Sequence, residues 1–159
     1  MIRPYRDADR DALWRLKRRF ELGLGEDADE AKAAAYREKL DDAYREDYLD
    51  WVDRCRAEEP RAVQVATRED SLVGYAFVLP ASMAHVWDAA VLNELYVDPQ
   101  VRGEEAADDL MRAALSVARD QDLPLDRIVL DVDRENERAR AYYDRWGFEH
   151  WGEMVAREL

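Results

Sequence analysis

The sequence predicts a mixed α/β fold of the α+β type, forming one domain over residues 1–159. The first observation is size, because a chain of this length with 48% hydrophobic residues can bury a single core. The second is the hydrophobic pattern, which changes between helical spacing and strand alternation. Its order is strand, helices, hairpin, strand, helix, strand, helix, strands. The third is the lack of an internal repeat, linker or low-complexity tract in the sequence.

Residues 1–6 predict a short strand whose proline indicates an edge or a strand end, because proline cannot donate to a sheet ladder. A helix follows, capped by Asp7 or Asp9, and residues 25–26 are expected to end it. Its apolar residues recur at helical spacing: Leu13, Leu16, Phe20 and Leu24. Residues 27–59 then predict two more helical stretches, which Pro60 closes.

Strand alternation begins at residue 62. Residues 62–70 and 71–80 predict a hairpin around a polar turn at 68–71, and residues 91–97 predict a further strand. The remaining expected elements are a helix from near residue 105 to 121, a strand at 127–132, a helix at 135–146 and closing strands at 148–151 and 153–158.

Charge excludes some classes of partner. The formal net charge is -13, which argues against nucleic acid, because binding to nucleic acid relies on basic patches. No apolar run approaches the length of a membrane span and no signal peptide opens the sequence, so we expect a cytoplasmic protein without membrane contact. Only three of the 24 basic residues are lysine, at positions 17, 32 and 39. An acidic surface poor in lysine is typical of halophile proteins, although an ordinary acidic protein is the alternative.

Cysteine and histidine are scarce. Cys55 is the single cysteine, so no internal disulfide can form, and a structural thiol is expected on a helix. His85 and His150 without a cysteine cluster offer little to a zinc ion, and we expect no metal. A carboxylate site for Mg²⁺ or Ca²⁺ stays open, although no EF-hand spacing is present.

The stretch VDPQVRGEEAADDL at 97–110 predicts a strand end, a proline turn, a tight loop and the start of a helix. The first amides of a helix lack internal partners and can bind phosphate. Gly103 would allow close approach of the backbone, and Arg102 would add positive charge. An ordinary strand–helix connection is the alternative.

A second motif combines Asn136, Ala139, Tyr143, Gly147 and Phe148. Asn136 is expected to cap the helix, and its amide could also bind a ligand. Tyr143 offers a phenol that can donate a proton, whereas its alternative role is a core aromatic. We assign that core role to the neighbouring Tyr142.

Together these motifs resemble the GNAT superfamily of N-acetyltransferases. The acetyl-CoA motif of that superfamily is Arg/Gln-x-x-Gly-x-Gly/Ala between a strand and a helix, and its next motif is Asn-x-x-Ala-x-x-x-Tyr-x-x-x-Gly-Phe. The second motif is matched at every position, and LYVDP at 95–99 is similar to the end of the fourth strand in the superfamily. The resemblance implies a mixed, mostly antiparallel twisted sheet flanked by helices. It also implies acetyl-CoA as co-substrate and a primary amine acceptor, and allows a homodimer.

The resemblance also implies the site residues. Tyr143 matches the general acid, and we name Glu94 as the base, with a structural role as its alternative. The expected cofactor-binding residues are Leu95, Tyr96, Val97, Arg102, Gly103, Glu104, Glu105, Ala106, Ala107, Asn136 and Tyr143.

The first motif departs from the superfamily pattern. Glu105 replaces a glycine, and Glu104 stands where a basic residue is common. One carboxylate would repel phosphate by about 1 kcal/mol at about 4 Å in water, which weakens binding without abolishing it. The alternative to an active enzyme is therefore a catalytically inactive CoA-binding or regulatory module.

The acceptor is expected to bind between the helices at 27–59 and the strand edges, with candidate residues Tyr5, Tyr75, His85 and Trp87 and the acidic residues of 27–47. An acidic pocket would attract a cationic amine of a small molecule or a protein. The alternative is that these acids reflect only the acidity of the whole chain.

Overall fold

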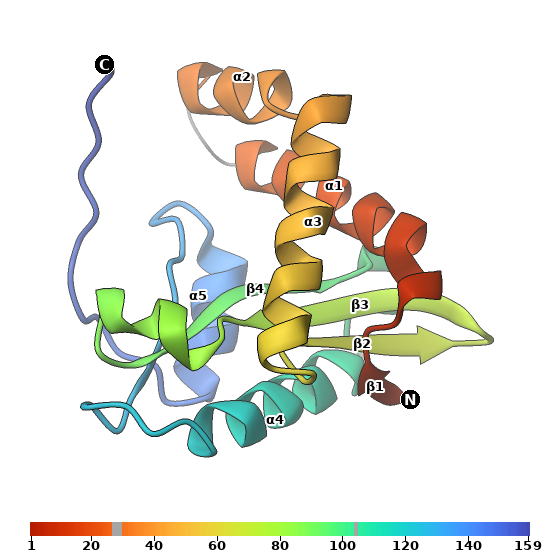
Figure 1. Ribbon diagram of the computed structural model, residues 1–159. Helices are drawn as coiled ribbons and strands as arrows, with labels where there is room; N and C mark the ends of the chain where they lie inside the picture. The colour runs from red at the N-terminus through yellow and green to blue at the C-terminus, as the bar shows by residue number, and fades with distance from the viewer. Residues whose placement is uncertain (27–29, 104) are drawn as a thin grey trace.

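The computed structural model describes residues 1–26, 30–103 and 105–159, without the side chains of residues 25 and 26 (Figure 1). The helices are α1 (Arg10–Glu26), α2 (Glu30–Glu38), α3 (Asp42–Glu58), α4 (Ala106–Arg119) and α5 (Glu137–Arg145), and the strands are β1 (Ile2–Pro4), β2 (Val63–Arg68), β3 (Ser71–Val78), β4 (Ala90–Val97) and β5 (Ile128–Val129). Short 3₁₀ turns are η1 (Asp7–Asp9), η2 (Ala81–Val86) and η3 (Pro99–Val101).

The described strands form a five-stranded sheet in the order β1-β2-β3-β4-β5. All neighbouring pairs are antiparallel except β4 and β5, which are parallel. The mixed, mostly antiparallel sheet with flanking helices confirms the fold class. At the tip of the β2–β3 hairpin, Glu69 and Asp70 both have positive φ, as in a tight two-residue turn.

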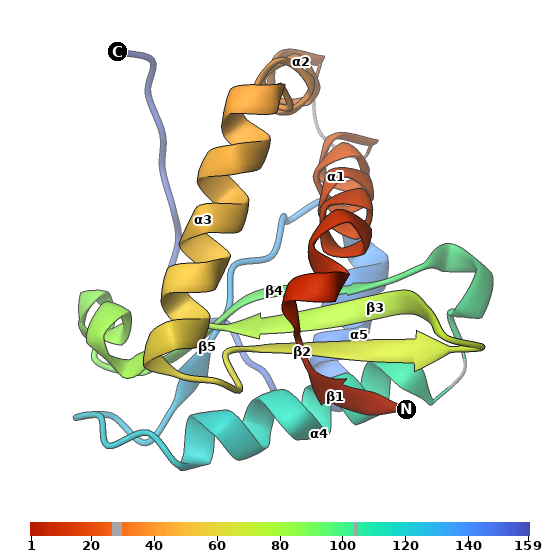
Figure 2. The same ribbon diagram turned by 45° about the vertical axis from the view of Figure 1, so that its right-hand side comes forward.

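The sheet separates two hydrophobic clusters. Figure 2 shows α1 and α3 on one face and α4 on the other. Because side chains alternate along a strand, β3 sends Tyr75 and Phe77 into the cluster beneath α1 and α3. Ala76 and Val78 point into the cluster that contains α4 and the partly buried aromatics of α5. The central strands are therefore covered on both faces.

Strands β4 and β5 separate soon after they meet. Only Ala90–Ile128 and Val91–Val129 are paired, whereas β4 continues to Val97. From Leu92 onward β4 pairs with β3, and among the described residues no strand pairs with its second edge, which is called the open edge below. The strand expected at 127–132 is thus correct in place but far shorter than predicted.

A β-bulge interrupts β4. Phe77 pairs with Glu94 and Val78 pairs with Leu92, so Asn93 has no partner in the register. The bulge turns Asn93 outward, while the next residue, Glu94, is buried.

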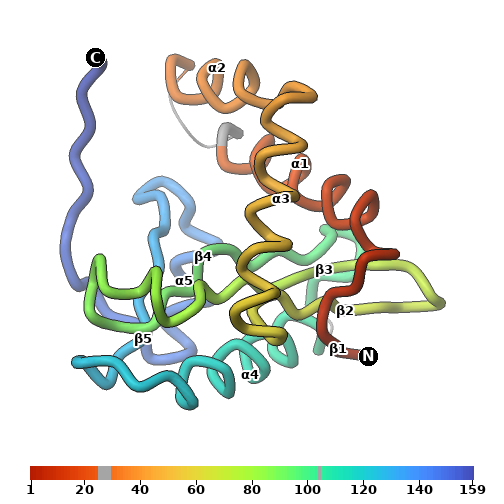
Figure 3. The backbone as a smooth tube through the Cα atoms, viewed as in Figure 1, coloured from red at the N-terminus to blue at the C-terminus, as the bar shows by residue number. Residues whose placement is uncertain are grey.

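The closing strands expected at 148–151 and 153–158 are wrong. Residues 149–159 form no helix or strand and are exposed, and Figure 3 shows this segment running away from the sheet. A strand needs a neighbouring edge to satisfy its backbone groups, and alternation in sequence does not supply that edge. The helix end expected at residues 25–26 is confirmed, because α1 runs to Glu26.

No helix in the described ranges is long and apolar enough to cross a membrane.

Candidate active site

The loop between β4 and α4 is shaped by its own side chains. Asp98 Oδ1 accepts a hydrogen bond from the Gln100 amide at 3.1 Å, which caps η3. The other oxygen of Asp98 pairs with Arg19 Nη1 at 2.7 Å, which anchors the loop to α1. Gly103 has φ +86°, a conformation that glycine adopts without strain. The glycine is therefore required by the backbone turn.

Arg102 folds back onto the end of β4. Its Nε donates to the Val97 carbonyl at 3.2 Å, and its guanidinium lies 6.0 Å from the ring centre of Tyr96. The positive charge of Arg102 is thus held beside the open edge of β4. Val97, whose carbonyl accepts the hydrogen bond from Arg102, is one of the predicted cofactor-binding residues.

Helix α4 begins at Ala106 with an N-terminus that can bind an anion. Glu105 occupies the N-cap position and makes no side-chain cap hydrogen bond, so its carboxylate does not satisfy the amides of the first turn. Those amides and the helix dipole favour a phosphate group. Glu104, which the sequence places in the same site, lies outside the described residues.

The acids of the first turn of α4 are partly neutralised. Asp109 pairs with Arg112 at 2.6 Å, and Asp108 lies 3.9 Å from Arg145 of α5. The local negative charge is therefore smaller than the sequence EEAADD suggests.

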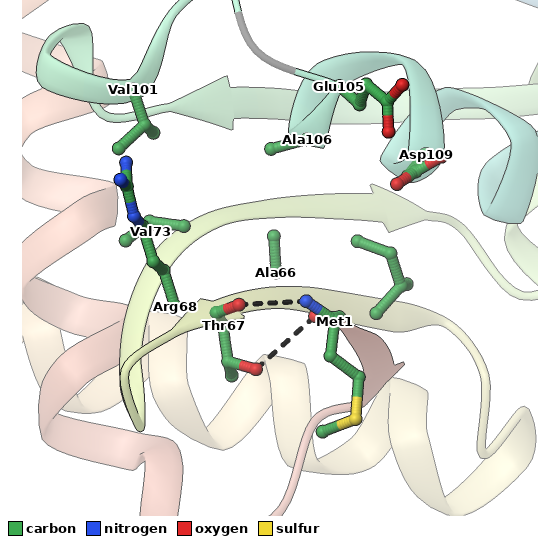
Figure 4. Close-up of a pocket in the computed structure, with 10 residues that line it drawn as sticks. Met1, Ala66, Thr67, Arg68, Val73, Val101, Glu105, Ala106 and Asp109 are labelled. Carbon is green, nitrogen blue, oxygen red and sulfur yellow. Dashed lines mark hydrogen bonds between the residues drawn. The ribbon is translucent and has the colours of Figure 1, made fainter.

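A depression with a volume of about 520 Å³ adjoins the start of α4 (Figure 4). Glu105 and Asp109 reach it from α4, whereas Thr67 and Arg68 reach it from β2. Of the predicted cofactor-binding residues that the structure describes, Glu105 and Ala106 line this depression, and the others do not.

The side chains of Leu95, Tyr96 and Val97 are used for packing. Tyr96 packs in the cluster beneath α1, with its ring centre 6.2 Å from Phe20 and 6.4 Å from Tyr75. Leu95 and Val97 belong to the cluster on the α4 side. Any contact of this segment with a cofactor along the open edge of β4 therefore falls to its peptide groups.

Asn136 and Gly147 mark the two ends of α5. The Asn136 side chain accepts from the Ala139 amide at 3.1 Å, so the expected N-cap is confirmed. Gly147 has φ +84° and ends the helix, where the Phe148 amide donates to the Tyr143 carbonyl at 3.1 Å. The spacing of the second motif thus has a structural explanation.

Tyr143 is half-buried on α5. Its ring centre lies 5.6 Å from Tyr142 and 5.6 Å from Phe148, and both neighbours meet it edge-on. Burial raises the pKa of Tyr143 to about 12, although the nearby Arg138 works in the opposite direction. The phenol is therefore protonated at neutral pH and can donate a proton.

Glu94 lies in a buried polar network. Its Oε1 accepts from the Tyr48 hydroxyl at 2.8 Å, and its Oε2 accepts from Lys17 Nζ at 3.1 Å and from the Tyr75 hydroxyl at 3.3 Å. Burial, followed by the charge of Glu94, holds the pKa values of Tyr48 and Tyr75 well above the ordinary value.

Sequence reasoning missed Lys17 and Tyr48. A signal for Lys17 exists, because Lys17 and Glu21 lie four residues apart within the stretch of α1 that carries the buried Leu13 and Leu16. Opposite charges at this spacing on one helix face indicate an ion pair. That Glu94 is a second partner of Lys17 is visible only in the tertiary structure.

The residues proposed for the acceptor are scattered. Tyr5 and Tyr75 are buried in the core, whereas His85 and Trp87 are exposed at η2 and the residue after it. Residues 27–29, part of the acidic run, lie outside the described residues. Within the described part, no group of three metal-ligating side chains occurs.

Comparison with known proteins identifies the family, because the model of the acetyltransferase (GNAT) family matches residues 25–148. The chain belongs to the acetyltransferase (GNAT) family. Membership confirms the resemblance found in the two sequence motifs, and the motif from Asn136 to Phe148 lies inside the matched range.

Curated GNAT relatives match parts of the chain. An uncharacterized N-acetyltransferase from Mycobacterium bovis is 33% identical over 97 residues, which is 61% of this chain and 58% of that protein. A mycothiol acetyltransferase from Salinispora tropica is 39% identical over 74 residues, which is 45% of this chain and 24% of that protein. The match thus spans less than two thirds of either relative.

Solved GNAT-like structures share the fold over nearly the whole chain. A ribosomal-protein-alanine N-acetyltransferase from Brucella melitensis superposes with TM-score 0.72 at 24% identity, covering 96% of this chain and 86% of that one. The PaiA N-acetyltransferase from Thermoplasma acidophilum, solved in complex with coenzyme A, gives TM-score 0.71 at 20% identity, covering 94% and 89%. At this identity the likeness establishes the fold.

Proposed function

We propose that this GNAT family member transfers an acetyl group from acetyl-CoA to a primary amine of a small molecule or a protein. The observation that carries the proposal is the separation of β4 from β5. It leaves the open edge of β4 beside the Arg102–Gly103 loop and the start of α4, where the Glu105 side chain makes no cap hydrogen bond.

The proposal gives the cofactor two anchors. The peptide groups of β4 from Leu95 to Val97 bind the pantetheine arm along the open edge. The amides that begin α4, at Glu105, Ala106 and Ala107, bind the pyrophosphate, with Arg102 supplying positive charge. Asn136 is used by the α5 cap, and its remaining amide donors are available to the cofactor.

The transfer itself follows from the chemistry of a thioester. The amine nitrogen attacks the carbonyl carbon, the C–N bond forms and the C–S bond breaks. Tyr143 donates its proton to the departing thiolate. Glu94 accepts the proton that the amine must lose, and its Oε1, with one hydrogen bond from Tyr48, retains a lone pair for that purpose.

The second candidate function is a CoA-binding or regulatory module without turnover. Glu105 favours it, because the side chain places negative charge at the end of the helix that would hold phosphate. The two candidates differ in turnover and share cofactor binding.

Calorimetric titration of acetyl-CoA at low salt and in molar KCl tests the shared step, and release of free thiol with a panel of amines tests the transfer. The panel contains a polyamine, an aminoglycoside and a peptide with a free N-terminus. We expect micromolar binding and turnover of at least one amine. Binding without turnover across the panel favours the second candidate, and no binding at either salt contradicts both.

We also propose that the protein forms a homodimer. Trp151, Met154 and Val155 are exposed by 64%, 71% and 94% in the segment that leaves the sheet, and covering them stabilises an assembly. Light scattering on the purified protein distinguishes a dimer from a monomer.

A further inference from the structure

Four charged side chains alternate in sign from the surface to β4. Lys39 pairs with Glu21 Oε2 at 2.9 Å, Glu21 pairs with Lys17, and Lys17 pairs with Glu94 at 3.1 Å. Lys39 is partly exposed, whereas Lys17, Glu21 and Glu94 are only 5%, 3% and 4% exposed. Two lysines balance two glutamates, so the buried network is neutral.

The ammonium of Lys17 is held from several sides. It lies 4.6 Å from the ring centre of Tyr48 and 5.4 Å from that of Phe20, in addition to its two carboxylate partners. Burial alone lowers the pKa of Lys17, but Glu94 and Glu21 outweigh it and raise that pKa above the ordinary value. Lys17 is therefore a fixed cation.

The groups around Glu94 come from three elements. Helix α1 supplies Lys17, with Glu21 behind it; α3 supplies Tyr48, with Tyr44 further out at 3.5 Å from Glu21; and β3 supplies Tyr75. Among the described residues, Lys17 is the one cation that contacts Glu94. Burial disfavours the charged form of a carboxylate that lacks a counter-ion, and Lys17 is the counter-ion that contacts Glu94.

We propose that Lys17 is a positioning residue that keeps Glu94 anionic and directs its Oε1 toward the reacting amine. The inference rests on the proposed acetyl transfer, in which Glu94 accepts a proton. Lys17 and Tyr75 donate to Oε2, so they fix the carboxylate plane and leave Oε1 with the Tyr48 hydroxyl as its close partner. Without Lys17 the protonated form of Glu94 is favoured, and a protonated carboxyl cannot act as base.

The test is the pH dependence of kcat/KM in three variants. Lys17→Met keeps the length and apolar stem but removes the charge, Lys17→Arg keeps the charge, and Lys39→Met removes the outer lysine of the same network. We expect the acid limb of the profile to move upward by at least about one pH unit in Lys17→Met. The two controls should follow the wild type more closely. A folded Lys17→Met protein with the wild-type profile overturns the inference.

A second measurement covers the case in which Lys17→Met folds but is too unstable for steady-state kinetics. The double variant Lys17→Met/Glu94→Gln removes both charges of the pair, so it should melt at a higher temperature than Lys17→Met alone. A double variant that is no more stable than the single variant overturns the inference. If the wild type binds acetyl-CoA but acetylates no amine, the proposed function fails instead, and the melting comparison still decides whether Lys17 and Glu94 are coupled.

Discussion

Two adjacent tyrosines on α5 have different environments. The Tyr142 hydroxyl is buried, and burial followed by the charge of Asp108 raises the pKa of Tyr142 above its ordinary value. For Tyr143 burial raises the pKa to about 12, and the nearby charge of Arg138 lowers it. Both phenols stay protonated at neutral pH, so their position relative to a bound cofactor decides which one could serve as the proposed acid.

Replacing Tyr143 with phenylalanine removes the proposed proton donor and keeps the ring that packs on Phe148. We expect kcat to fall by at least about 10-fold, because a positioned acid contributes about 100-fold or more to such steps. The Kd for CoA should change little. Steady-state kinetics and calorimetry measure both quantities, and Tyr142→Phe is the matched control. Equal kcat values for wild type and Tyr143→Phe would remove Tyr143 from the mechanism.

At the scale of elements, the β4–α4 loop combines a favourable helix end with an unfavourable charge. Glu105 has φ −68° and ψ −11°, so the position does not need glycine for its backbone conformation. The cost of Glu105 to a bound phosphate is therefore electrostatic or steric, and two substitutions separate these causes.

Glu105→Gln removes the charge and keeps the size of the side chain. We expect it to tighten CoA binding by about 5-fold at low salt, which corresponds to about 1 kcal/mol, and to have little effect in molar KCl. Glu105→Gly removes the side chain as well, and a further gain in CoA affinity in that variant measures the steric cost of the side chain. Titration calorimetry at the two salt concentrations gives the values. Weaker binding by both variants would show that the carboxylate supports the loop.

Helix α4 approaches the sheet closely at Gly74 of β3. A Cβ at this position would lie 2.8 Å from the Tyr96 carbonyl oxygen and 3.2 Å from Leu110 Cδ1. Because the backbone of β4 cannot move aside cheaply, we expect Gly74→Ala to lower the free energy of unfolding by about 1–3 kcal/mol.

Gly23 in α1 is the matched control for Gly74. A Cβ there would meet nothing within 4 Å, and alanine favours a helix, so Gly23→Ala should raise stability by about 0.5–1 kcal/mol. Urea unfolding of the two variants and the wild type measures the difference. A Gly74→Ala protein as stable as the wild type would mean that α4 and β4 separate more easily than their packing indicates.

At the scale of the whole molecule, the net charge of -13 makes the chain repel itself. Salt screens charges separated by more than about 10 Å at 0.1 M and affects buried pairs such as Lys17–Glu94 much less. We therefore expect the melting temperature to rise from low salt to molar KCl. Thermal unfolding over a KCl series, with sucrose as an uncharged control, measures the effect. A melting temperature that falls with KCl would show that surface ion pairs outweigh the net repulsion.

The sequence by itself determined the features that depend on neighbours along the chain. The helical spacing from Leu13 to Phe20, the polar turn at 68–71 and the cap of α5 at Asn136 are local, and the structure confirms them. The two motifs also indicated the family, which the comparison confirms. Three of their residues have local roles in the backbone: Asn136 caps a helix, and Gly103 and Gly147 adopt positive φ.

The tertiary structure decided what depends on contacts between distant elements. The early separation of β5 from β4 and the lack of a strand at 149–159 depend on which strand edges lie side by side in the fold. Hydrophobic alternation along the sequence does not give that information. The partners of Glu94 lie 77 residues away at Lys17 and 46 residues away at Tyr48. A buried carboxylate must be compensated by charge and hydrogen bonds, but only the packing of α1 and α3 against β4 determines which side chains supply them.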